Sequence, residues 1–110
     1  MVSSRHWVPE RGELVWLASR SRAGRRPALV LSPALYNGKT NLAVVCPITS
    51  HRKGYPFEVA LPAGSPIEGC ILSDHLKSVD WRERQAELIG RVRPDTLIQV
   101  LNRVAPLLGF

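Results

Sequence analysis

Short apolar runs broken by glycine and proline at near-regular intervals constrain the fold of this chain more than any other feature. The runs cover residues 13–17, 27–32, 41–47, 56–61, 68–73 and 86–90. Runs of this length are typical of β-strands, and the segments between them are typical of turns. The pair Asn37-Gly38 is a further turn signal of the kind that joins antiparallel strands. The pattern therefore predicts a mainly β fold, a small antiparallel barrel without βαβ units.

Only the C-terminal segment has a helical period. After residue 94 the apolar residues recur every three or four positions, as Leu97, Ile98, Leu101, Val104 and Ala105. Pro94 and Asp95 suit the first turn of a helix, where a missing N–H costs nothing and a negative charge is favourable. We therefore predict a C-terminal helix that Pro106 ends or kinks.

Two of the predicted strands are apolar at successive positions. Residues 28–31 and 42–46 show no alternation, so both faces of these strands require burial. In a barrel one face meets the core, and the other needs a covering helix or a second subunit. A homodimer covers both faces most simply, and a monomer with a tightly packed C-terminal helix is the alternative.

Length and charge limit the class of protein. A chain of 110 residues forms one domain, which we place at 1–110. Fifteen basic residues against nine acidic ones give a net charge of +6, and twelve of the fifteen are arginine. Because the arginine fork matches phosphate oxygens, this bias indicates a nucleic-acid partner, although a merely solvated basic surface would look similar.

The same survey indicates a cytoplasmic protein. No apolar run is long enough to span a bilayer, and residues 1–5 do not open a signal peptide. Cys46 and Cys70 lie inside apolar runs, so we expect them to be buried, reduced thiols.

The candidate chemistry lies at two strand ends. Residues 25–27 read RRP and residues 47–50 read PITS, so a guanidinium and a hydroxyl stand at the ends of neighbouring predicted strands. These groups can stabilise the charge that develops when a phosphodiester is attacked. The carboxylate and imidazole nearest in sequence, Asp74 and His75, would point to opposite faces of a strand, so we expect no metal site and no cofactor. Without a metal, the available nucleophile is the 2′-hydroxyl that RNA carries and DNA lacks.

Four motifs in fixed order resemble the MazF/PemK family of toxin endoribonucleases, and its MazF branch in particular. They are RPALVLSP at 26–33, YNGKT at 36–40, KGYPFEV at 53–59 and DHLKSVDWR at 74–82. The resemblance extends over nearly the whole chain, from residue 8 to the C-terminal helix. It implies a barrel of the CcdB/MazF type with a C-terminal helix.

The resemblance also implies an activity and a site. The family consists of metal-independent, sequence-specific ribonucleases that cut single-stranded mRNA and leave a 2′,3′-cyclic phosphate and a 5′-hydroxyl. Its essential arginine and threonine correspond to Arg26 and Thr49. Such toxins belong to type II toxin–antitoxin systems, which implies an acidic, MazE-like antitoxin that covers the basic groove.

One segment departs from the family. Relatives often have a longer loop with an acidic residue before the Arg-Pro pair, whereas residues 19–25 read SRSRAGR and contain no acid. A general base placed there is therefore absent. The PemK branch uses an Arg and an Asp two residues apart, and these positions fall on Leu72 and Asp74, so Asp74 is the candidate base.

Other polar residues are expected to contact RNA through phosphates or unstacked bases. They are Arg25, Asn37, Ser50, Lys53, Tyr55, His75 and Lys77. Arg20 and Arg22 are expected to add sequence-independent attraction. His6 and His51 are expected to be solvated, and Trp7, Trp16 and Trp81 to lie in a core or an interface.

Two other functions remain open from the sequence. One is a non-catalytic barrel toxin that acts by binding a protein, as CcdB-like toxins bind topoisomerase. The other is an RNA-binding regulator, which the missing loop acid permits. The presence of both Arg26 and Thr49 favours the ribonuclease.

Overall fold

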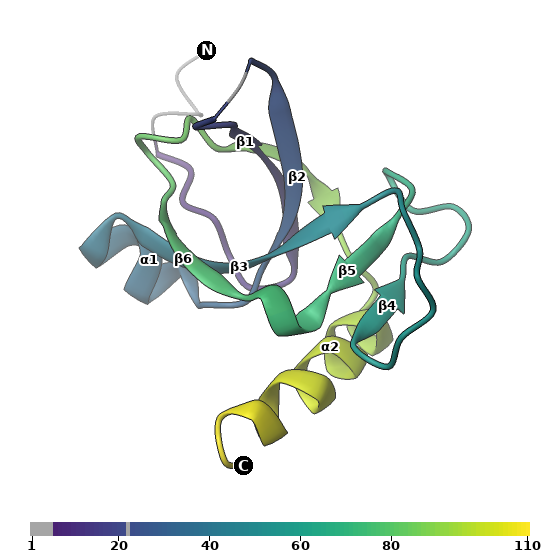
Figure 1. The fold of residues 1–110 in the computed structure, drawn as a ribbon. Coiled ribbons are helices and arrows are strands. Elements are labelled where there is room, and N and C mark those ends of the chain that lie inside the picture. Colours follow the sequence, from purple (N-terminus) through teal and green to yellow (C-terminus); the bar gives the residue numbers. More distant parts are fainter. Residues whose placement is uncertain (1–5, 22) are drawn as a thin grey trace.

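The computed structural model describes residues 6–21 and 23–110. Arg22 and residues 1–5 lie outside it, and with them the segment for which no signal peptide is expected. The elements follow the order β1 (Glu13–Ala18), β2 (Arg25–Val30), α1 (Ala34–Thr40), β3 (Leu42–Thr49), β4 (Glu58–Ala60), β5 (Cys70–Leu72), the 3₁₀ turn η2 (Ser73–His75), β6 (Lys77–Asp80), β7 (Glu87–Arg91) and α2 (Pro94–Leu107). The strands form one curved antiparallel sheet, and α2 packs on one side of it (Figure 1). The predicted fold class is confirmed, although the sheet does not close completely into a barrel.

β3 is the centre of the sheet. Its first half pairs with β6, from Leu42 opposite Asp80 to Val45 opposite Lys77. Its last residues pair with β5, with Thr49 opposite Cys70. On its other edge β3 pairs with β2, which continues the sheet through β1 to β7. A single strand therefore connects the curled part of the sheet to the small β4–β5 ribbon, and it ends at Thr49 where the two parts diverge.

Two apolar clusters fill the two faces of the sheet. One lies between the sheet and α2 and includes Leu14, Leu29, Ile71 and Val100. The other fills the concave side and comprises mainly Val15, Leu17, Ala28, Val30, Ala43, Val45, Val79 and Trp81. Successive residues of β2 and β3 therefore alternate between two cores of the same chain. One chain thus buries both faces of these strands, with α2 covering one of them, so their apolar pattern does not by itself require the homodimer that it was taken to favour.

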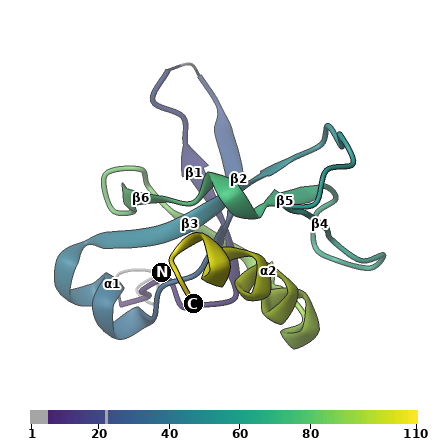
Figure 2. The same cartoon turned by 60° about the horizontal axis from the view of Figure 1, so that its bottom comes forward.

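The C-terminal helix forms as the sequence predicted. Pro94 occupies its first turn, and Thr96, Val100 and Val104 are buried at helical spacing. Pro106 lies in the last turn, so its missing N–H interrupts the helix only where it already ends. Seen from the second direction, α2 lies on the opposite side of the sheet from the projecting ends of β1 and β2 (Figure 2).

One local prediction was wrong, and one strand was missed. Asn37 and Gly38 lie inside α1 and form no hairpin turn, and the left-handed position is Asn41 at the end of that helix, with φ of 63°. Strand β6 was missed because its residues read KSVD and include a single apolar residue, Val79, which is also the only buried residue of the strand. Tertiary contacts override weak local signals of this kind.

The two cysteines are free and buried, as predicted. Burial raises the pKa of the Cys46 thiol to about 12, and nearby Asp74 adds to this effect. The thiol therefore stays protonated and acts as a small apolar side chain. Among the helices of the described residues, none has the length and apolar character needed to cross a membrane.

Candidate active site

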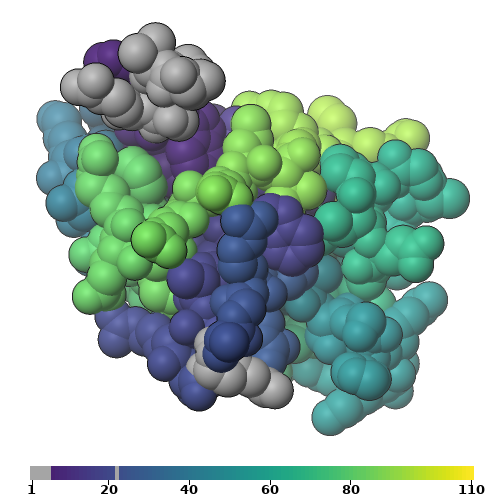
Figure 3. Space-filling view, turned by 90° about the horizontal axis from the view of Figure 1, so that it is seen from above, coloured from purple at the N-terminus to yellow at the C-terminus, as the bar shows by residue number. Residues whose placement is uncertain are grey.

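A pocket of about 890 Å³ lies where the ends of β1, β2 and β3 meet. Seen from above, the start of β2 is flanked by the segment that leads into β7 on one side and by segments around residues 50–70 on the other (Figure 3). The described residues that line the pocket include Trp16, Arg20, Ser21, Arg25, Arg26, Thr49, Ser50, His51, Ile67, Glu68, Leu72, Lys77 and Arg84. Five of these carry a permanent or near-permanent positive charge, and only Glu68 carries a negative one, so the pocket suits a polyanion.

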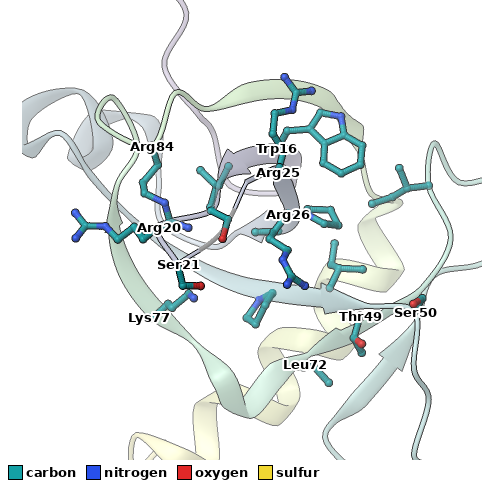
Figure 4. A pocket seen from close by; sticks show the side chains of 18 of the residues that line it. Trp16, Arg20, Ser21, Arg25, Arg26, Thr49, Ser50, Leu72, Lys77 and Arg84 are labelled. Carbon is teal, nitrogen blue, oxygen red and sulfur yellow. The ribbon is translucent and has the colours of Figure 1, made fainter.

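Arg26 and Thr49 belong to facing strands. The β2–β3 ladder pairs Ala28 with Pro47. Extending that register by two residues places Arg26 opposite Thr49. The close view shows the Arg26 side chain extending toward the part of the pocket that contains Thr49 and Leu72 (Figure 4). The structure therefore brings together the two residues that the sequence proposed as a unit.

The Thr49 hydroxyl has a defined orientation. Its Oγ1 accepts a hydrogen bond from the backbone N–H of His51 at 3.1 Å. One lone pair is thereby occupied, and the hydroxyl hydrogen remains available to donate to an oxygen in the pocket. Gly69 packs against the other side of Thr49, where a Cβ would lie 2.7 Å from the Thr49 carbonyl oxygen. No side chain fits at position 69, so the glycine allows β5 to approach the end of β3.

Arg25 and Arg26 are adjacent but differ in their surroundings. The Arg25 guanidinium pairs with Glu87 and lies 5.5 Å from the centre of the Trp16 ring. Arg26 makes no ion pair with any carboxylate of residues 6–21 and 23–110. Arg25 is therefore held at the rim, whereas the Arg26 charge is free to meet an anion.

Two further arginines of the pocket are also held by the protein. Arg20 pairs with Glu83, and Arg84 donates from Nε to the Ala18 carbonyl oxygen at 2.5 Å. Lys77 is exposed on β6. Together with Arg25 on β2, these groups present positive charge around Arg26 from the loop after β1, from β6 and from the segment that leads into β7.

A second polar cluster lies outside this pocket. Tyr55 Oη is 3.5 Å from both Asp74 Oδ1 and His75 Nε2, and the Asp74 and His75 atoms are 3.8 Å apart. Asp74 and His75 lie in the 3₁₀ turn η2 and on no strand, so the condition under which their side chains would point to opposite faces is not met. Desolvation raises the pKa of Tyr55, and the neighbouring Asp74 charge raises it further.

This cluster contains three of the predicted site residues, but none of them is among the residues that line the pocket. Asp74 therefore does not line the pocket that contains Arg26 and Thr49, and its catalytic role stays an untested prediction.

The loop between β3 and β4 is held by Glu58. Its carboxylate accepts hydrogen bonds from the backbone N–H of Lys53 at 2.9 and 3.1 Å and from that of Gly54 at 2.9 Å. These bonds, chiefly the one from Lys53, lower the pKa of Glu58. The motif at 53–59 is thus a closed turn, and neither Lys53 nor Tyr55 is among the residues that line the pocket.

Of the predicted RNA contacts, Arg25, Ser50 and Lys77 line the pocket. The prediction for Asn37 was wrong. Its side chain is fully buried, where it accepts a hydrogen bond from Ser32 Oγ at 2.6 Å and donates one to the Pro9 carbonyl at 2.8 Å. Asn37 ties α1 to the N-terminal segment and has no exposed atom to offer RNA.

Sequence reasoning missed several lining residues, namely Trp16, His51, Glu68 and Arg84. Only the position of His51, two residues after Thr49, was a usable signal. The others come from β1, from the segment before β5 and from the segment before β7, which the sequence does not place together. Among residues 6–21 and 23–110, no three His, Cys, Asp or Glu side chains gather in a way that could hold a metal ion.

The chain is similar to known proteins over nearly its whole length. Residues 10–108 match the family described as PemK-like, MazF-like toxin of type II toxin–antitoxin system. The Escherichia coli K12 endoribonuclease toxin MazF is 41% identical over 114 aligned residues, covering 99% of this chain and 100% of the relative. Endoribonuclease PemK from E. coli is 32% identical, covering 90% and 81% respectively.

A solved structure agrees with these relatives. The MazF chain in a MazE–MazF crystal structure from Deinococcus radiodurans superimposes with a TM-score of 0.89 at 52% identity. The match covers 94% of this chain and 98% of that one. The family match, the relatives and the solved structure therefore agree on one class of protein.

Proposed function

Because this chain belongs to the PemK-like, MazF-like toxin family of type II toxin–antitoxin systems, we propose that it cuts single-stranded RNA at specific sequences without a metal ion. It is an endoribonuclease of the MazF type. The observation that carries the finer proposal is the convergence of Arg26 and Thr49 from facing strand ends into one basic pocket. We further propose mRNA in the cytoplasm as its substrate.

The proposed reaction uses the nucleophile of the substrate. The 2′-oxygen attacks the adjacent phosphorus, and the 5′-oxygen leaves with its bonding electrons. The products are a 2′,3′-cyclic phosphate and a 5′-hydroxyl. Arg26 stabilises the negative phosphorane through its guanidinium, and the Thr49 hydroxyl donates to a non-bridging oxygen. Fixed donors of this type commonly contribute most to the rate when charge develops in a sheltered site.

Cleavage in excess EDTA tests this chemistry. We expect labelled single-stranded RNA to be cut at the same rate with and without the chelator, and the products to carry cyclic phosphate and 5′-hydroxyl ends by mass spectrometry. Strict dependence on magnesium, or a 3′-hydroxyl product, would contradict the mechanism. Binding without cleavage would favour the RNA-binding regulator instead.

We also propose an acidic MazE-like antitoxin as the inhibitor of this chain. The related D. radiodurans protein was solved as a MazE–MazF complex, and the basic pocket described above offers an acidic segment the same charges as RNA. An acidic antitoxin peptide should therefore compete with RNA for the pocket. Competition that persists unchanged in Arg26→Ala and Arg20→Gln variants would place the inhibitor elsewhere.

We also propose that the chain forms a homodimer. The reason is the exposed apolar surface of α2 and not, as expected from the sequence, the burial of β2 and β3. Both faces of the sheet are already buried, but the outer face and end of α2 expose large apolar side chains. Ile98 is 56% exposed, Leu108 60% and Phe110 90%. A second copy would bury this surface. Sedimentation at micromolar concentration should give twice the 12.2 kDa of one chain, and Leu108→Glu should shift the mass toward that of the monomer.

A further inference from the structure

The proposed reaction needs a group that removes the proton from the 2′-hydroxyl, and the pocket limits which group that is. The loop 19–25 contains no carboxylate. Asp74, the base expected from the sequence, is paired within a separate cluster and does not line the pocket. Among the described lining residues, only His51 and Glu68 carry a side chain that can accept a proton at neutral pH.

We propose that His51 is the general base of this pocket, a role that rests on the proposed function. The backbone of His51 is joined directly to the phosphate-binding group, since its N–H donates to Thr49 Oγ1 at 3.1 Å. A phosphate held by that hydroxyl therefore lies next to the His51 residue. The imidazole is exposed, so it can turn toward a bound 2′-hydroxyl.

The charges that surround His51 favour imidazole over carboxylate. The positive charges of the pocket come from Arg25 and Arg26 on β2, Arg20 in the loop after β1, Lys77 on β6 and Arg84 in the segment before β7. These cations attract the phosphodiester, which carries a negative charge. A carboxylate such as that of Glu68 is repelled by the phosphodiester that it would have to approach, whereas a neutral imidazole is not.

The proton balance of the step is simple. A ring nitrogen of His51 takes the 2′-hydroxyl proton as the new bond between the 2′-oxygen and phosphorus forms. The bond between phosphorus and the 5′-oxygen breaks, and water supplies the proton for that oxygen. His51 then returns its proton to solvent, so the enzyme ends the cycle unchanged and no oxidant or reductant is required.

The test is the pH dependence of single-turnover cleavage at saturating protein. In the parent protein the rate should fall as the pH is lowered and His51 becomes protonated. His51→Gln should lower the rate at neutral pH by roughly 10²–10³-fold, the range typical of a lost general base, and should abolish this pH dependence. His6→Gln is the matched control, because His6 is exposed and lies outside the pocket. It should leave both rate and profile unchanged.

Chemical rescue distinguishes catalysis from a structural role. Added imidazole should restore cleavage to His51→Gly in proportion to its concentration and should not affect Arg26→Ala. Loss of the pH dependence in Glu68→Gln, with His51→Gln retaining it, would overturn the proposal in favour of the carboxylate. A parental rate in His51→Gln would overturn it as well. Absence of cleavage by the parent protein would instead refute the proposed function itself.

Discussion

The pocket around Arg26 and the cluster around Asp74 both gather polar and charged side chains, but they differ in whether these groups already have partners within the protein. In the cluster, Tyr55, Asp74 and His75 lie within 3.5–3.8 Å of one another and interact mainly among themselves. In the pocket, the Arg26 charge has no ion-pair partner among the described residues, and the Thr49 hydroxyl hydrogen is free. An anion-binding site is thus distinguished by charges and donors that have no partner in the protein. Groups that are already paired within the protein would have to break those interactions before they could bind an anion.

Among the substitutions that test this difference, replacement of Arg26 should have the largest effect on the cleavage rate. Arg26→Ala should lower single-turnover cleavage by roughly two to three orders of magnitude, as the loss of an oxyanion-hole donor does. Arg26→Lys should recover little, because a point charge on a flexible stem does not reproduce the guanidinium fork. Arg25→Ala is the adjacent comparison and should act mainly on binding. Cleavage by Arg26→Ala at the parental rate would move the active site elsewhere.

Thr49→Val should have the next largest effect. The substitution keeps the shape of the side chain and removes the donor, so we expect a roughly tenfold to hundredfold lower rate, as for a hydrogen bond to a charged group. Fluorescence anisotropy should show nearly unchanged RNA affinity, and the melting temperature should change little. A variant that cleaves normally would show that the Thr49 hydroxyl does not touch the reacting phosphate.

Glu58 connects the two regions, because it holds the loop that leads from Thr49 toward Tyr55. Glu58→Gln should raise KM about threefold to tenfold by loosening the turn, the range expected for hydrogen bonds of ordinary strength, and should affect kcat less. Since its pKa is lowered in the folded protein, the carboxylate is ionised and the turn intact at neutral pH. The turn should open as the pH falls through that lowered pKa, which hydrogen exchange at Lys53 and Gly54 would measure.

Arg20 should matter for affinity and little for chemistry. Arg20→Gln should weaken binding about threefold for all RNA sequences alike. The slope of log affinity against log salt concentration should become shallower by about 0.7, which corresponds to the loss of one phosphate contact on a single strand. Arg93→Gln is the control, since Arg93 is exposed outside the pocket. An effect restricted to one cleavage sequence would instead make Arg20 a base-reading residue. Arg22, expected to behave similarly, lies outside the described residues.

Asp74→Asn should have the smallest effect on the cleavage rate. A large effect would instead assign the chemistry to the cluster around Asp74. We expect a rate within about threefold of the parent, because a base acts only within hydrogen-bond reach of its proton and Asp74 lies outside the pocket lining. Tyr55→Phe, measured in parallel, should behave similarly. A hundredfold loss in Asp74→Asn with unchanged stability would restore the sequence-based assignment of the base and remove the case for His51.

Much of the fold was predictable because its signals are local. Apolar runs between glycine and proline mark most of the strands, and the three-to-four-residue period after Pro94 marks α2. Where the local signal was ambiguous, the prediction failed. The Asn37-Gly38 pair resembles a hairpin turn, but burial of the Asn37 amide between Ser32 and Pro9 stabilises a helix there instead.

The sequence by itself determined the fold class, the toxin family and the pairing of Arg26 with Thr49, because periodicity and ordered motifs are properties of the chain alone. Only the tertiary structure decided that one chain buries both faces of β2 and β3, that Asn37 is inaccessible, and that Asp74 lies apart while His51 and Glu68 line the pocket. These outcomes depend on contacts between residues far apart in the sequence. Such contacts are set by strand register and sheet curvature, which no single segment encodes.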